Sequence, residues 1–136
     1  MEHYVKLMTT LLNIRKNVIL KTDVDSKKEL AKHYKNSDVF IAPSLYGESF
    51  GIVILEAMAS MTPPIASYQG GIKEIINHKK TGFLFPRGNA KKLAEYIEIL
   101  LTDKKLWLKI SRNAHKEAKK YDWKKVVKQI EKVYKN

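Results

Sequence analysis

The chain has 136 residues and no cysteine, which excludes disulfides, zinc–thiolate sites and a cysteine nucleophile. Its 26 Lys and Arg residues against 14 Asp and Glu residues give a formal net charge of +12, which favours anionic partners such as nucleotides, acidic lipids or nucleic acid. The excess is mostly lysine spread through predicted helices, so we interpret it chiefly as solvated surface rather than as a nucleic-acid footprint.

The first third of the chain contains two predicted helices. Apolar residues at helical spacing predict a helix over residues 4–14, and the β-branched run at 17–20 predicts a short strand. Asp25 or Ser26 is positioned to cap the next helix, with Glu29 as the capping-box partner. This second helix is expected to end near residue 36.

The middle of the chain alternates predicted strands with predicted helices. In order, the pattern predicts a strand at 38–43, a loop at 44–49, an apolar helix at 50–60 that is buried nearly all round, a strand at 65–67, a short helix at 72–77 and a strand at 81–86. Such alternation is typical of βαβ units with right-handed crossovers. It therefore predicts an α/β fold with a parallel sheet covered on both faces.

Three further helices are predicted in the last third, each starting after a capping residue. These caps are Asn89, Asp103 and Asp122. The last helix carries an apolar stripe opposite several lysines, which we interpret as packing, with a basic helix lying on a membrane surface as the alternative. No repeat or linker divides the chain.

The loop at 44–51 is the strongest candidate for a binding site. In open parallel sheets, ligands bind beyond the carboxyl ends of the strands. The helix that follows this loop offers unpaired N–H groups and the positive end of its dipole, which together favour an anion. Gly47 and Gly51 have no Cβ, so a ligand can approach the backbone closely. The pattern predicts a phosphate site.

Two carboxylates flank this predicted phosphate site. Glu56 stands in an apolar helix, about 7.5 Å along the axis from Gly51, and its side chain leans back toward the loop. A buried carboxylate needs partners, and a ribose diol would suit it. Glu48 lies at the mouth of the loop, where it could accept hydrogen bonds from a second sugar. The arrangement favours a ligand whose phosphates lie between two polyols.

These residues resemble the signature of a known family. The stretch at 48–59, read ESFGIVILEAMA, places Glu48 and Glu56 with seven residues between them. Gly70, Gly71 and Glu74 follow, together with TGFLF at 81–85, and NSDVFIAPS precedes at 36–44. In combination the motifs resemble the retaining glycosyltransferases called group 1, or family 4, and the resemblance covers essentially the whole chain.

The resemblance implies a Rossmann-like three-layer domain with a parallel sheet, equivalent to most of the C-terminal half of a GT-B glycosyltransferase. It implies that Glu56 binds the ribose of a nucleotide-sugar and that Glu48, the candidate catalytic residue, contacts the hydroxyls of the donor sugar. Backbone N–H groups of the intervening donor-binding residues would meet phosphate and sugar, namely Ser49, Phe50, Gly51 and Ile52. Neither a metal nor a cofactor is implied.

The chain also departs from the family pattern. Residues 1–136 are interpreted as the donor domain, lacking its first βα unit, where the family keeps a cationic clamp for the diphosphate, and lacking the N-terminal acceptor domain. We therefore expect a hexosyltransferase-type enzyme whose 136-residue part binds nucleotide weakly and transfers nothing alone. The alternatives are another GT-B enzyme, such as a phosphorylase or a nucleotide-sugar epimerase, a non-catalytic nucleotide-binding or regulatory module, and a nucleic-acid binder.

The expected partners are a UDP-, GDP- or ADP-sugar donor and a glycan or lipid-linked acceptor, and not nucleic acid. No apolar run approaches the roughly 20 residues that span a bilayer, and the N-terminus does not read as a signal peptide. The absence of cysteine fits a reducing compartment. We expect a cytoplasmic protein, with peripheral contact at the inner membrane face as an alternative.

Overall fold

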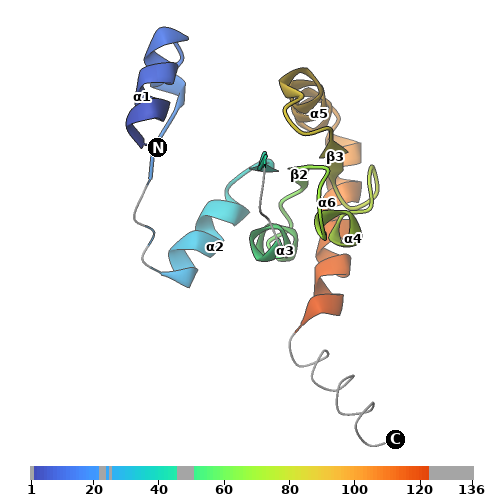
Figure 1. Ribbon diagram of the computed structural model, residues 1–136. Coiled ribbons are helices and arrows are strands. Elements are labelled where there is room, and N and C mark those ends of the chain that lie inside the picture. Colours follow the sequence, from blue (N-terminus) through green and yellow to red (C-terminus); the bar gives the residue numbers. More distant parts are fainter. Residues whose placement is uncertain (1, 22–23, 25, 46–50, 123–136) are drawn as a thin grey trace, which may run out of the picture. The chain divides into compact units, whose positions relative to one another are not determined.

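The computed structural model describes residues 2–21, 24, 26–45 and 51–122 (Figure 1). The chain falls into two compact units, Met1–Leu30 and Ala31–Asn136, a division that the sequence pattern does not predict. Residues 46–49 of the predicted loop, residue 50 of the predicted apolar helix and the predicted last helix after Asp122 lie outside the described residues.

The first unit contains helix α1 (Glu2–Leu11), the 3-10 helix η1 (Arg15–Asn17) and the first turn of α2 (Lys27–Lys35). The N–H of Glu29 donates to Ser26 Oγ at 3.1 Å, which confirms Ser26 as a cap. The predicted strand at 17–20 is wrong, because residues 18–20 have no regular structure. No described strand pairs with this run and Ile19 is 84% exposed, so its β-branched side chains have no sheet to pack on.

The second unit alternates strands and helices as predicted. After the end of α2 it contains, in order, β1 (Phe40–Ala42), α3 (Ile52–Ala59), β2 (Pro64–Ser67), α4 (Ile72–Ile75), β3 (Phe83–Phe85), α5 (Ala90–Thr102), α6 (Lys104–Ala118) and the 3-10 helix η2 (Lys119–Tyr121). The three strands form a parallel sheet in the order β1-β2-β3. This confirms the predicted α/β fold with a parallel sheet.

Both faces of this sheet are covered, because successive side chains of a strand point to opposite faces. Ile65 belongs to the cluster that includes α5, whereas Ala66, the next residue of β2, belongs to the cluster that includes α3 and α4. Figure 1 shows α5 on the opposite side of the sheet from α3 and α4. Helix α6 contributes Ile110 to the first cluster and Ala114 to the second. The second unit therefore has three layers.

Two of the predicted caps fix where the last described helices begin. Asn89 Oδ1 accepts from the N–H of Lys92 at 2.9 Å, and Asp103 Oδ1 accepts from the N–H of Leu106 at 2.9 Å. Each bond satisfies one of the N–H groups that a helix leaves without a partner at its start. In the part of the chain that the structure describes, no helix combines the length and apolar character needed to cross a membrane.

Candidate donor site at the carboxyl edge of the sheet

The loop that follows β1 is tied to the ends of the other two strands. Ser67, the last residue of β2, donates from Oγ to the carbonyl oxygen of Ser44 at 2.6 Å. Arg87, just after β3, donates from Nη1 to the carbonyl oxygen of Leu45 at 3.2 Å. The start of the loop is thus fixed at the carboxyl edge of the sheet, where parallel α/β folds bind ligands.

Helix α3 begins at a glycine whose conformation few other residues adopt. Gly51 has φ +62° and ψ +36°, in the left-handed region. Its carbonyl oxygen accepts from the N–H of Ile54 at 2.9 Å, and as a glycine it has no side chain that could cap the helix. The first N–H groups of a helix have no partner within it. The start of α3 therefore offers N–H donors, as an anion site requires.

The exposed face of α3 corrects one expectation. The apolar sequence predicts a helix buried nearly all round, but Ile52 is 62% exposed and Val53 is 39% exposed, whereas Ile54 and Met58 are fully buried. An apolar run has no polar face to mark its orientation, so the pattern cannot tell which side meets solvent. The side chains of Ile52 and Val53 in the first turn of α3 are therefore exposed, whereas Gly51 and Ile54 are buried.

Glu56 lies on the half-buried part of α3 and has one partner in the described structure. Its Oε2 accepts a hydrogen bond of 3.1 Å from the hydroxyl of Tyr34, which lies on α2. No other described side chain or N–H group bonds the carboxylate, so Oε1 has no partner among the described residues. Among the described residues, the Glu56 carboxylate is therefore bonded through one oxygen only.

Tyr34 is the residue that sequence reasoning missed. It is 8% exposed, and burial first, then the charge and hydrogen bond of Glu56, raise the pKa of Tyr34 to about 12. Its hydroxyl therefore stays protonated and donates at neutral pH. A signal existed in the sequence, because a buried tyrosine and a carboxylate in an apolar helix each need a polar partner.

The predicted site residues divide into two groups. Gly51, Ile52 and Glu56 are described, and all three lie on or at the start of α3. Glu48, Ser49 and Phe50 lie outside the described residues, so their predicted roles stay predictions. Within the described residues, no group of three His, Cys, Asp or Glu side chains is placed to hold a metal ion.

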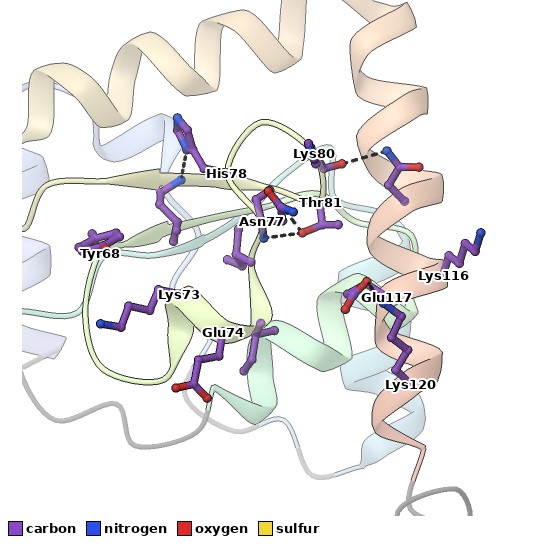
Figure 2. Close-up of a pocket in the computed structure, with 14 residues that line it drawn as sticks. Tyr68, Lys73, Glu74, Asn77, His78, Lys80, Thr81, Lys116, Glu117 and Lys120 are labelled. Atoms are coloured by element: carbon purple, nitrogen blue, oxygen red, sulfur yellow. Dashed lines mark hydrogen bonds and ion pairs between the residues drawn. The ribbon is translucent and has the colours of Figure 1, made fainter.

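A hollow of about 730 Å³ lies elsewhere on the second unit, between α4, the connection after it and α6 (Figure 2). Two hydrogen bonds join its walls: Asn113 Nδ2 donates to the Lys80 carbonyl at 3.1 Å, and the hydroxyl of Tyr121 donates to the Glu74 carbonyl at 3.3 Å. None of the described residues of the predicted donor site, Gly51, Ile52 and Glu56, lines the hollow.

His78 in the wall of this hollow makes stability depend on pH. Its Nδ1 accepts from the N–H of Leu84 at 3.0 Å, which requires an unprotonated Nδ1, and Figure 2 shows this bond. Burial, and after it the charges of Lys79 and Lys92, lower the pKa of His78 below 6.5. The unfolded chain therefore takes up a proton first as pH falls, so stability is full above about pH 6.5 and declines below it.

We expect the melting temperature of the wild type to fall between pH 7 and pH 5. In the variant His78→Asn the melting temperature should fall less over the same range. The Asn oxygen can accept from the Leu84 N–H without titrating. Thermal unfolding followed by circular dichroism at several pH values measures this. The matched control variant is His3→Asn, which replaces an exposed histidine of the first unit. Identical profiles for wild type and His78→Asn would contradict the assignment.

The comparisons with known proteins point to one family. The family model described as "Glycosyl transferases group 1" matches residues 1–117. An uncharacterized glycosyltransferase of Methanocaldococcus jannaschii is 37% identical over 137 residues, which cover 99% of this chain and 34% of that protein. The chain therefore spans about a third of the length of this curated relative.

Solved structures with the same fold lead to the same family. Sucrose-phosphate synthase from Thermosynechococcus elongatus superposes with a TM-score of 0.89 and 29% identity, covering 98% of this chain and 33% of that one. Anabaena HepE, solved in complex with UDP-glucose, superposes with a TM-score of 0.85 and 27% identity, covering 98% of this chain and 37% of that one. The likeness extends over the Rossmann-like architecture of GT-B glycosyltransferases.

Proposed function

The chain belongs to the group 1 glycosyl transferases, and from that premise we propose that it binds the donor for transfer of a sugar from a nucleoside-diphosphate sugar. In this proposal residues 1–136 form the donor side of the cleft, and the acceptor side comes from elements outside these residues. The observation that carries it is the position of Glu56. Glu56 lies on α3 and accepts a hydrogen bond from Tyr34 of α2, and α3 begins after Gly51 beyond the carboxyl end of β1.

In this proposal different parts of the nucleotide-sugar bind to different residues of the motif. Glu56 accepts from the ribose hydroxyls, and the N–H groups at the start of α3, at Gly51 and Ile52, bind the diphosphate. Glu48 accepts from hydroxyls of the donor sugar, with Ser49 and Phe50 supplying further N–H groups. UDP-glucose in the HepE complex supports this ligand class, because HepE shares the fold over 98% of this chain.

The chemistry follows from where charge develops. Breaking the bond between sugar and diphosphate leaves negative charge on the departing nucleoside diphosphate, and N–H groups already aimed at that position stabilise it without reorganising. In this proposal the first N–H groups of α3, which follow Gly51, are the donors. We propose retaining transfer of a hexose, with Glu48 as the catalytic residue at the donor sugar.

We also propose the class of acceptor and the place in the cell where transfer occurs. The acceptor is a glycan or a lipid-linked molecule, as the names of relatives such as the phosphatidyl-myo-inositol mannosyltransferase of Mycobacterium leprae suggest; that protein is 36% identical over 74% of this chain. The site of action is the cytoplasm, at the inner membrane face where the acceptor is lipid-linked. A net charge of +12 would favour contact with acidic lipid.

Calorimetric titration of the chain with UDP, GDP, ADP and their sugars tests the proposal. We expect one nucleotide to bind weakly, in the micromolar to millimolar range, and no sugar transfer by the 136-residue chain alone. Absence of binding by all three at millimolar concentration would refute the donor site. Turnover by this chain would refute the division into donor and acceptor sides, and steep salt-dependent binding of DNA that does not depend on Glu56 would favour a nucleic-acid binder.

A further inference from the structure

We propose that Tyr34 is a positioning residue for the donor, whose hydroxyl fixes the Glu56 carboxylate in the orientation that receives the ribose hydroxyls. This inference rests on the proposed function, because it concerns the residue to which that function assigns the ribose. Its basis is the 3.1 Å hydrogen bond from the Tyr34 hydroxyl to Glu56 Oε2, between residues 22 positions apart in the chain.

Both the backbone and the ring of Tyr34 contact neighbouring residues. Its carbonyl oxygen accepts from Thr62 Oγ1 at 2.6 Å, and Thr62 is 1% exposed. Its ring packs edge-on against Phe40 of β1, with centroids 5.5 Å apart and an interplanar angle of 71°. The hydroxyl therefore projects from a ring that has little freedom to move, and a rigid support of this kind keeps a binding group in place.

The two oxygens of the Glu56 carboxylate differ in their contacts, as a positioning role of Tyr34 requires. Tyr34 occupies Oε2 and leaves Oε1 without a partner among the described residues. Glutamate has three rotatable bonds, and a free side chain would lose that freedom when a ligand binds. Because the tyrosine bond restrains the carboxylate beforehand, less of the ordering cost falls on the ligand. The tyrosine stays a donor at neutral pH, since the pKa of Tyr34 is raised to about 12.

The variant Tyr34→Phe tests the role, because it keeps the ring against Phe40 and removes only the hydroxyl. The wild type and the variant are titrated with the diphosphate among UDP, GDP and ADP that the wild type binds tightest, and with pyrophosphate, which lacks the ribose. We expect roughly three- to ten-fold weaker binding of the nucleoside diphosphate, as one hydrogen bond contributes. The affinity for pyrophosphate should be unchanged.

Two further variants separate positioning from a structural effect. Tyr96→Phe removes the hydroxyl of another buried tyrosine, which packs against Phe83 on the other face of the sheet, and should leave both affinities unchanged. In the Glu56→Gln background, Tyr34→Phe should change the affinity for the diphosphate less than two-fold. A full additional loss there would show that Tyr34 acts independently of Glu56, and would overturn the proposal.

A measurement on the wild type makes the test independent of whether the variant folds. With ¹³C at the Cζ position of tyrosine, the Tyr34 resonance should shift on addition of the nucleoside diphosphate and not on addition of pyrophosphate. The inference is overturned, and the proposed function is not, if the wild type binds the nucleoside diphosphate without a shift of the Tyr34 resonance and Tyr34→Phe binds it as tightly as the wild type. Equal loss of pyrophosphate binding would indicate a structural role and overturn it too, whereas no binding by the wild type overturns the proposed function with it.

Discussion

Replacing Glu56 with glutamine should weaken nucleoside-diphosphate binding roughly ten- to hundred-fold. A carboxylate that accepts from ribose hydroxyls makes charge-assisted hydrogen bonds, each contributing about 1.5–3 kcal/mol. Glutamine keeps the shape and one acceptor oxygen, so the hydroxyl of Tyr34 still has a partner and the fold should be retained. Isothermal titration calorimetry with the diphosphate that the wild type binds tightest measures the change.

A matched control removes a carboxylate of the same type elsewhere. Glu95 on α5 forms an exposed pair with Lys92 at 2.8 Å, so Glu95→Gln changes the net charge equally and should leave nucleotide binding unchanged. Pyrophosphate adds a second control, because Glu56→Gln should not weaken its binding. If both Glu variants bind nucleotide like the wild type, Glu56 is not the ribose acceptor.

The variant Gly82→Ala should destabilise the second unit by about 3 kcal/mol, a large share of the stability of a small domain. A Cβ at Gly82 would lie 2.6 Å from the carbonyl oxygen of Pro64 and 2.8 Å from Pro64 Cγ, both far below contact distance, and 3.1 Å from Ile76 Cγ2. Pro64 is the first residue of β2, so relieving the clash means shifting the central strand. Urea unfolding measures the loss.

Gly88 provides the contrasting control. Its φ is +73°, so alanine there is strained, but a Cβ would meet nothing within 4 Å. We expect Gly88→Ala to cost about 1–2 kcal/mol, the usual cost of the left-handed conformation. Gly82→Ala should therefore be the more destabilising of the two. A change in stability below about 0.5 kcal/mol for Gly82→Ala would contradict the close approach of the β2 and β3 segments.

Features encoded by neighbouring residues could be predicted from the sequence. The strands at β1, β2 and β3 stand out as short apolar runs bounded by turn residues, and the caps Asn89 and Asp103 are marked by the side chain itself. The parallel sheet follows from the alternation of these elements. Of the motif residues, Gly51 precedes the first residue of α3 and Glu56 lies within α3, and their binding roles stay predictions.

Features set by tertiary contacts could not be predicted in this way. The run at 17–20 has strand composition but no strand partner among the described residues, and the exposed side of Ile52 and Val53 depends on which elements pack against α3. Tyr34 meets Glu56 only because α2 and α3 come together, 22 residues apart in the chain. Periodicity assigns a residue to a face and does not name its partner.

The central claim is that a nucleoside diphosphate binds at the start of α3, and NMR titration of the ¹⁵N-labelled chain tests it most directly. As UDP, GDP or ADP is added, we expect the backbone amide signals of Gly51, Ile52 and Glu56 to shift and saturate together. Signals around Asn113 and Lys116, which line the hollow between α4 and α6, should stay in place. Shifts confined to that hollow, or no shifts at millimolar nucleotide, would contradict the account.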